Sequence, residues 1–508
     1  MASKLKARIV KKKPGKWTNK HENFSIQISG LYDIWNPSVS ANRQLEAYNA
    51  TTKSLQNLIG TVSKKGERIR ALGSAWSISR AAATDGRLIN TKPLNRLFRV
   101  SDPSISDSYT GDSKNLYFVQ CGVSIGELNR YLRLQGKSLK TSGASNGQTI
   151  AGALSTGTHG SAIDTGSVQD FVKGLHLITG PNRHVWLERA SDPVTTPGFA
   201  DRLEAEVIRD DNTFNAALVS FGSFGIIHGV LIETEDIYLL EASRIKLPFN
   251  DDLKQVIHTL DFSRIPLPEP ENRPYHFEVV INPHAADDQA FSTVMYKRQY
   301  QENNAERRRA SGGFQPGDDF LGVIGTLLDI APSAIPTAVN QLLASQYREY
   351  SGRTGTLGDI FSATGIRGKA TGAAMGVPLE KTLQALDAIL KVHNRSKNFP
   401  GVIALRYVKK SDALLAFTRY PPTCIIDLDA VDNQTARNFF RGVWREFEMQ
   451  NIPYTLHWGK ANELTSENLQ NMYADDLDIW LNIRRSLLDE ENRFTFSSPF
   501  TDQCGLSE

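Results

Sequence analysis

The sequence has few cysteines and no long apolar run. Its 508 residues include three cysteines, Cys121, Cys424 and Cys504, which lie far apart and form no CxxC pair. A disulfide framework and a structural zinc site are therefore not expected, and no other metal site is indicated. Because no run of about 18 apolar residues occurs, we expect no membrane-spanning helix.

An excess of charge of one sign is also missing. Lys and Arg number 58 against 55 Asp and Glu, so the formal net charge is +3. Proteins that bind nucleic acids present a much more basic face, so no nucleic-acid partner is expected. Residues 1–16 are basic but lack the apolar stretch of a signal peptide, which predicts a solvated tail, with surface targeting as the alternative. Together with the few cysteines, this favours a cytoplasmic protein.

The two best-known nucleotide-binding motifs are absent. No GxGxxG opens a helix, and no Gly-Lys-Ser/Thr follows a glycine-rich loop, so neither a Rossmann site nor a Walker loop is indicated. Glycine-rich turns do follow expected strands at residues 73–77 and 143–160. Such turns let backbone N–H groups approach a diphosphate, but tight turns in a sheet-rich domain would look the same.

Strands and helices alternate in the first part of the chain. A helix is expected at 55–62 and a strand at 116–120. A second helix begins after Ser124, because Glu127 completes a capping box, and it ends at Gly136, which suits the left-handed position.

The pattern changes from about residue 239. Strands are expected at 276–281, 402–408 and 423–428, and an amphipathic helix at 378–392. This order predicts an antiparallel sheet with helices on one face. Residues 297–369 are weakly patterned and are interpreted as an insertion, in part a lid, with mobility expected at 307–317.

Five segments, taken together and in order, carry a resemblance to a known family. They are residues 69–77 (IRALGSAWS) with 84–90, 122–128 (GVSIGEL), 152–161 (GALSTGTHGS), 220–229 around Gly225-Ile226-Ile227, and 456–460 (LHWGK) with the closing 494–500. Their order resembles the flavoprotein superfamily of vanillyl-alcohol oxidase and para-cresol methylhydroxylase. The last segment is similar to the aldonolactone and alditol oxidase branch.

The resemblance implies an α+β fold and the cofactor FAD. An FAD-binding domain of two α+β subdomains would span residues 1–238, and a substrate-cap domain built on an antiparallel sheet would span 239–440. Residues 441–508 would return to the active site. The residues implied to bind FAD are Gly73, Ser74, Ala75, Trp76, Ser77, Ser142, Gly143, Thr149, Gly152, Thr156, Gly157, Thr158, His159, Gly160 and Ile227.

The sequence departs from the family at the flavin. Many members attach the flavin covalently through a histidine just before the serine of the first segment, where this chain has Trp76. Some relatives use a cysteine near the start of the third segment, and residues 142–146 contain none. We therefore expect FAD to be bound non-covalently.

A second departure concerns the substrate. In the polyol-oxidising branch a strand of the cap carries Glu and Arg two positions apart; here Arg406 is present, but Ala404 replaces the acid. The next strand lacks a histidine found in that branch, and the register of Asp427 and Asp429 is left open. Loss of the carboxylate acceptor disfavours simple alditols and sugar lactones and favours a larger, less polar or anionic substrate.

The sequence therefore predicts an FAD-dependent oxidoreductase that oxidises a small-molecule alcohol by hydride transfer to the flavin. Arg406 is the candidate anion partner and His457 the candidate base. Lys460 is the candidate cation beside the electron-rich edge of the flavin. The alternatives are a biosynthetic tailoring enzyme acting on a complex metabolite and a flavin-binding protein without turnover. The electron acceptor, oxygen or another compound, is left open.

Overall fold

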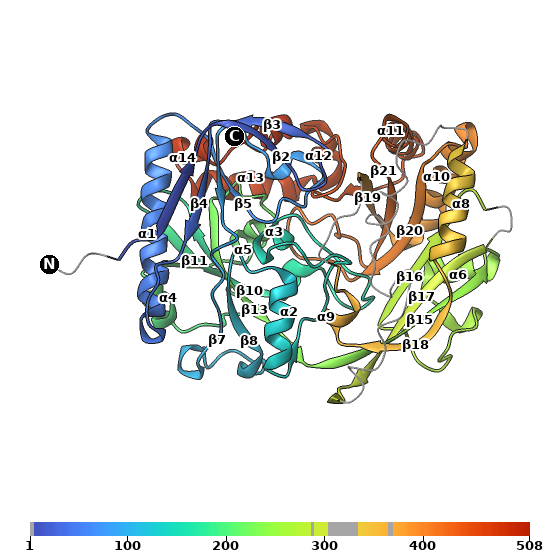
Figure 1. Ribbon diagram of the computed structural model, residues 1–508, viewed down its shortest axis with the longest axis horizontal. Coiled ribbons are helices and arrows are strands. Elements are labelled where there is room, and N and C mark those ends of the chain that lie inside the picture. Colours follow the sequence, from blue (N-terminus) through green and yellow to red (C-terminus); the bar gives the residue numbers. More distant parts are fainter. Residues whose placement is uncertain (1–4, 286–288, 303–333, 364–368) are drawn as a thin grey trace.

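The computed structural model describes residues 5–285, 289–302, 334–363 and 369–508. These residues form three larger β-sheets and two two-stranded ones, with helices packed on the sheet faces (Figure 1). The expected α+β class is confirmed. None of the helices in this part of the chain combines the length and apolar character that a membrane crossing needs.

The first sheet lies near the N-terminus and has four strands. Its order is β1 (Arg8–Lys12), β4 (Gly30–Trp35), β6 (Arg87–Asn90) and β5 (Ile69–Leu72). Helix α1 (Gln44–Ser63) buries the expected apolar stripe, in which Leu55, Ile59 and Val62 are fully covered.

The expectation of a solvated tail at residues 1–16 is wrong for part of that segment. Strand β1 pairs antiparallel with β4, and β2 (Gly15–Thr18) forms a hairpin with β3 (Ser25–Ile28). The side chains of β1 stay exposed, so its composition resembles that of a tail, and only the distant pairing partner makes it a strand.

The second sheet has six strands and is mostly antiparallel. Its order is β12 (Glu206–Arg209), β11 (His184–Glu188), β10 (Val172–Ile178), β13 (Ile226–Glu233), β8 (Leu116–Gln120) and β7 (Leu97–Arg99). Helix α2 (Ile125–Leu134) has the predicted capping box, because Ser124 and Glu127 bond each other's backbone N–H groups. Gly136 has the expected left-handed backbone, with φ of 66°. Helices α3 (Ile150–Ser155), α4 (Pro197–Leu203) and α5 (Asp211–Leu218) belong to the same part of the chain.

The third sheet has eight strands, all paired antiparallel. Its order is β18 (Tyr350–Gly355), β15 (Tyr238–Pro248), β17 (Gln289–Gln299), β16 (His276–Ile281), β20 (Gly401–Val408), β21 (Thr423–Val431), β19 (Ala370–Pro378) and β22 (Thr455–Leu456). The expected helix at 378–392 begins later, as α10 (Thr382–Ser396), because β19 continues through Pro378.

The two faces of this sheet differ in what covers them. Phe277, Ile403 and Leu428 belong to the main core with α6 (Asp251–Thr259), α10 and α11 (Gln434–Met449). Because side chains alternate along a strand, the neighbouring residues Glu278, Ala404, Arg406, Asp427 and Asp429 lie on the opposite face. That face carries the charged groups described below.

The segment 297–369 is only partly an excursion. Strand β18 is an edge strand of the large sheet, and α8 (Ile335–Gln346) packs through Ile335, Val339 and Leu343 on its charged face. The expected mobility at 307–317 lies outside the described residues. The domain boundaries at 238 and 440 stay a prediction.

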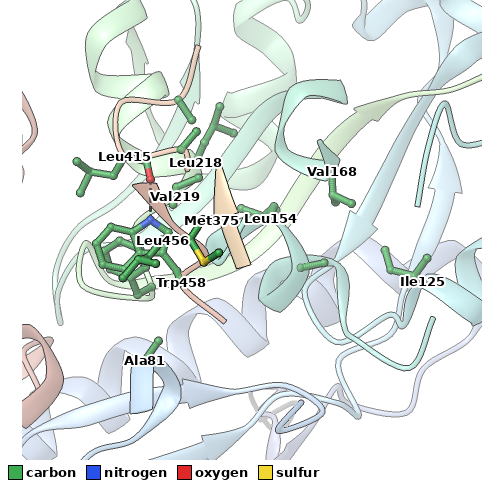
Figure 2. Packing of buried hydrophobic residues seen from close by; sticks show 14 of the residues in the cluster. Ala81, Ile125, Leu154, Val168, Leu218, Val219, Met375, Leu415, Leu456 and Trp458 are labelled. Atoms are coloured by element: carbon green, nitrogen blue, oxygen red, sulfur yellow. Dashed lines mark hydrogen bonds between the residues drawn. The ribbon is translucent and has the colours of Figure 1, made fainter. Parts of the chain in front are cut away.

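The C-terminal helices return to the N-terminal half, where Figure 1 shows α13 (Asp475–Leu487) and α14 (Glu490–Thr495) close to α5 and α1. Helices α12 (Ser466–Tyr473) and α15 (Pro499–Gln503) complete this segment. The buried Trp458 packs with residues from distant segments of the chain, among them Leu218, Met375 and Leu456 (Figure 2). Its Nε1 donates to the Leu415 carbonyl at 2.7 Å.

Candidate functional site

Two glycine-rich turns converge on one cavity between the sheets. The first, residues 73–77, follows β5, and the second runs from residue 143 into α3 and on to residue 160. Thr149 caps the N-terminus of α3 through its hydroxyl. A Cβ added to Gly73 would lie 2.2 Å from Thr149 Oγ1, so glycine is needed where the two turns touch.

Most of the predicted cofactor residues line this cavity. They are Gly73, Ser74, Ala75, Trp76, Ser77, Gly143, Thr149, Gly152, Thr156, Thr158, His159 and Ile227. The candidate catalytic residues Arg406, His457 and Lys460 line the same cavity, although they come from the eight-stranded sheet and the C-terminal segment.

Three predicted cofactor residues do not line the cavity: Ser142, Gly157 and Gly160. A Cβ on Gly157 would face Phe417 at 3.3 Å, and one on Gly160 would lie 2.7 Å from the Ser142 carbonyl oxygen. These residues shape the loop from behind.

Several lining residues were missed by the sequence analysis, among them His21, Ile78, Gln148 and Phe221. His21 reaches the cavity through the β2–β3 hairpin, and its ring lies edge-on to Trp76 with 5.7 Å between the ring centres. No pattern in the sequence marks it, because the contact joins residues 55 positions apart. Gln148 directly precedes Thr149 and could have been found as its neighbour.

The cavity leaves polar atoms without partners, as a site for a polar cofactor would. Ser74 Oγ, Trp76 Nε1 and Gln148 Oε1 are buried and have no hydrogen-bond partner within the described residues. Buried polar groups are normally bonded, so these atoms indicate that a bound molecule completes the site. Donors, acceptors and glycine-rich turns around one cavity fit FAD.

A charged cluster from the eight-stranded sheet lines one side of the cavity. Arg406 Nε donates to Glu278 Oε1 at 2.8 Å, and Arg406 Nη1 donates to Asp427 Oδ2 at 3.0 Å. The register of β16, β20 and β21 places Glu278 beside Arg406 and Asp427 beside Ala404. The open question about Asp427 and Asp429 is thereby answered, because both point to the charged face.

Lys460 is held by the same carboxylates. Its Nζ donates to Asp427 Oδ1 at 2.5 Å and to Asp429 Oδ1 at 3.1 Å, and both aspartates are fully buried. Burial alone would raise the pKa of Asp427, but the Lys460 and Arg406 cations hold it well below its usual value. Arg406 and Lys460 therefore line the cavity as two cations, and buried carboxylates of the sheet balance their charges.

The hydrogen bonds of His457 define its tautomer. The backbone N–H of Gly459 donates to His457 Nδ1 at 2.9 Å, so the ring proton of the neutral histidine is on Nε2. Burial, with His159 and Lys460 nearby, lowers the pKa of His457 well below its ordinary value. A neutral ring that already carries its proton on Nε2 is a poor proton acceptor, so the role of His457 as base stays a prediction that this tautomer does not favour.

His159 has the opposite tautomer. Its Nδ1 lies 3.0 Å from the carbonyl oxygen of Gly160, which can only accept, so Nδ1 carries the proton and Nε2 keeps its lone pair. Burial lowers the pKa of His159 to about 4. The centres of the His159 and His457 rings lie 5.5 Å apart. His159 has an acceptor at Nε2, and His457 has a donor at Nε2.

No group of His, Cys, Asp and Glu residues within the described ranges is arranged to hold a metal ion. All three cysteines are free and buried.

Comparisons with known proteins agree with this geometry. Residues 44–188 match the family model described as an FAD binding domain, and residues 271–501 match that of D-arabinono-1,4-lactone oxidase. L-gulono-1,4-lactone dehydrogenase of Mycobacterium tuberculosis is 25% identical over 82% of this chain and 87% of its own length. L-gulonolactone oxidase of Mus musculus is 23% identical over 87% of this chain and 91% of its own length.

The fold is also found among solved structures. Cholesterol oxidase from B. sterolicum superimposes with a TM-score of 0.68 over 98% of this chain and 97% of that chain, at 12% identity. Two matched family models, relatives that span most of the chain and a shared fold all point the same way. These matches show an FAD-dependent oxidoreductase of the aldonolactone oxidase and dehydrogenase type, whose fold is similar to that of cholesterol oxidase.

Proposed function

We propose that the protein oxidises a hydroxyl-bearing carbon of a sugar-derived lactone. The observation that carries this proposal is the pair of cations, Arg406 and Lys460, that line the cavity with their counter-charges behind them. Both side chains only donate hydrogen bonds, and a lactone carbonyl only accepts them. Relatives named as acting on gulono- and arabinono-lactones support the same substrate class.

The same arrangement changes the earlier expectation about substrates. Loss of an acid at Ala404 suggested that sugar lactones are poor substrates, but Ala404 packs beneath α8 with Val280 and Val402. The carboxylates of Glu278 and Asp427 act through Arg406 instead. Because donors dominate this side of the cavity, we expect a lactone to fit better than an alditol, which has no carbonyl.

The histidines complete the proposed mechanism. Bound FAD supplies the hydride acceptor for such an oxidation. His159 Nε2 accepts a hydrogen bond from the hydroxyl of the reacting carbon and so orients it. His457 Nε2–H and the two cations bind the substrate oxygens that gain negative charge as the hydroxyl proton is released to solvent. His457 and Arg406 are themselves buried, which strengthens these interactions.

We further propose that FAD is held without a covalent bond at position 76, since an indole is no counterpart of a linking histidine. A cytoplasmic location also remains part of the proposal; three reduced and buried thiols are compatible with it. The two alternatives, a tailoring enzyme and a flavin-binding protein without turnover, gain no support from the cavity, whose cations face the space where a substrate would meet the cofactor.

The test is anaerobic reduction of the bound flavin. L-gulono-1,4-lactone or D-arabinono-1,4-lactone should bleach the flavin absorbance, and xylitol and sorbitol should bleach it at least tenfold more slowly at equal concentration, which is about the worth of one charge-assisted hydrogen bond. The variant Arg406→Met should slow bleaching by the lactones, whereas Arg264→Gln, an exposed change on the cap, should not. Faster bleaching by the alditols, or none by any lactone at full flavin occupancy, would refute the substrate class.

A further inference from the structure

A second cavity adjoins the flavin cavity and takes no part in the mechanism above. It has a volume of about 310 Å³, which is within the range of small-molecule sites. Its walls come from the β2–β3 hairpin, helix α11 and the C-terminal segment. We call it the side cavity.

Only one layer of chain separates the two cavities. Ile78 lines both, and Lys460 lines the flavin cavity while the next residue, Ala461, lines the side cavity. The backbone N–H of Ile78 donates to the Gly459 carbonyl at 2.8 Å, which ties the two segments of this wall together. A molecule in the side cavity would therefore be a neighbour of the cofactor without entering the substrate space.

Part of the wall of the side cavity is aromatic. Phe24, Phe440, Trp444 and Phe500 line the side cavity, and the last three are buried. Aromatic side chains of this kind can stack on a planar ring, while the rest of the wall is polar and includes Asp432, Arg437, Arg441 and Glu463.

Two donors of the wall, on Trp444 and Arg80, have no acceptor partner among the described residues. Trp444 is 8% exposed, and its buried Nε1 has no hydrogen-bond partner within the described residues. At the cavity mouth the Arg80 guanidinium lies 5.6 Å from the Phe24 ring centre, and no carboxylate of the described part of the chain pairs with it. Arg437 and Arg441, in contrast, are paired with Asp432 and Glu463. An indole N–H and a guanidinium both require acceptor oxygens on the ligand.

We propose that the side cavity binds a quinone-type electron acceptor, whose ring lies among the aromatic side chains and whose carbonyl oxygens accept from Trp444 Nε1 and Arg80. The quinone would gain two electrons and two protons and leave as a hydroquinone. The electrons and one proton come from the reduced flavin as it returns to the oxidised form, and the second proton comes from solvent. This inference rests on the proposed flavin site but not on the identity of the lactone.

The experiment uses holoenzyme whose flavin has been reduced by light without any lactone, so that its outcome is independent of the substrate proposal. Reduced enzyme is mixed with 1,4-naphthoquinone-2-sulfonate, and the return of the flavin absorbance is followed. We expect the rate to saturate with quinone concentration. Trp444→Phe keeps an aromatic ring but removes the donor. It should raise the quinone concentration for half-saturation about threefold to tenfold. Arg80→Gln should raise this concentration about tenfold, since the lost hydrogen bond is charge-assisted. Arg264→Gln, on the far cap, is the matched control.

A binding measurement on the oxidised holoenzyme gives a second readout. Titration calorimetry with the same quinone should show one site, weakened in Trp444→Phe and Arg80→Gln by the same factors as half-saturation. Reoxidation by oxygen, which needs neither donor, should be unchanged in both variants. Quinone kinetics and binding that are identical in all three variants and the parent would overturn the proposal, as would competition between the quinone and a lactone for one site.

Discussion

Lys460 Nζ lies 2.5 Å from Oδ1 of Asp427, a carboxylate that is fully buried and also bonded by Arg406. One aspartate thus links the two cations of the cavity, and it does so from β21, a strand behind the cavity wall. The position of each cation depends on this carboxylate, so a change at Asp427 acts on both.

The first prediction concerns this carboxylate. Asp427→Asn removes the negative charge that balances the two buried cations, Arg406 and Lys460. Removing one partner of a buried ion pair typically lowers the free energy of unfolding by about 3–5 kcal/mol. Thermal unfolding should show a clear fall in Tm, with kcat/KM for the lactone falling as well. Asp478→Asn, at an exposed position of α13, is the control. Equal Tm values for the two variants would show that the cluster is not a stabilising unit.

The second prediction concerns the turns around the cofactor. Gly73→Ala should raise the Kd for FAD at least tenfold, because the added Cβ would meet Thr149 Oγ1 and push the two turns apart. Gly15→Ala, where a Cβ would meet nothing within 4 Å, should leave the Kd unchanged. Titration of the apoprotein with FAD, followed by flavin fluorescence, measures both. Normal FAD binding by Gly73→Ala would mean that the turns do not need this contact.

The third prediction concerns the bond to the flavin. Acid precipitation of the yellow holoenzyme should leave a colourless pellet and release all the flavin, because Trp76 offers no nucleophilic nitrogen. Trp76→Phe should behave in the same way. A pellet that stays yellow would contradict the prediction, and the variant His21→Ala would then show whether the neighbouring histidine is the attachment point.

The fourth prediction is a loss of stability in acid. Tyr48 of α1 contacts two histidines of the six-stranded sheet: its Oη lies 2.7 Å from His176 Nδ1, and its ring stacks on that of His228 with 4.0 Å between the ring centres. Burial, with His184 and Arg96 nearby, lowers the pKa of His228 to about 3, and burial holds that of His176 well below its usual value. Below about pH 6.5 the unfolded chain binds more protons than the folded one, so stability is full above that pH and falls as the pH drops.

The size of this effect is measurable. One histidine with these pKa values costs about 2 kcal/mol at pH 5. Tm measured from pH 7.5 to 4.5 should decline with a steeper slope for the parent than for His228→Gln, while His258→Gln on α6 should follow the parent. A Tm independent of pH down to 4.5 would show that the buried histidines titrate normally.

The sequence predicted the parts of this site that lie within one segment. The turn at Gly73, the capped helix after Ser124 and the loop ending at His159 were all visible, because glycines and caps have local physical causes. The partners of Arg406 were not, since Glu278 lies 128 positions away and the pairing depends on strand register. The tautomer of His457 could not be predicted for a related reason: it is set by the backbone N–H of Gly459, which no side-chain pattern reveals.

The last prediction follows from the two tautomers. Because the pKa values of His457 and His159 are both lowered, the latter to about 4, the pH profile of kcat/KM should show no inflection near pH 6.5. It should fall as the pH drops through about 4, where His159 gains a proton on Nε2 and loses its acceptor. His159→Gln retains an acceptor oxygen and should keep a substantial part of the activity without that inflection. His159→Leu has no acceptor and should lose at least tenfold in kcat/KM, by about the worth of one hydrogen bond to a reacting group.

Acid also weakens the fold, so the rates must be taken by rapid transfer from pH 7.5 and compared with flavin fluorescence, which reports release of the cofactor. Activity that falls while the flavin stays bound belongs to the active site. An inflection near pH 6.5 that disappears in His457→Gln would show that His457 does act as the base. Equal activity of His159→Gln and His159→Leu would show instead that no hydrogen bond is accepted at this position, and the hydroxyl of the substrate would then have to be oriented by the side chains of the cap alone.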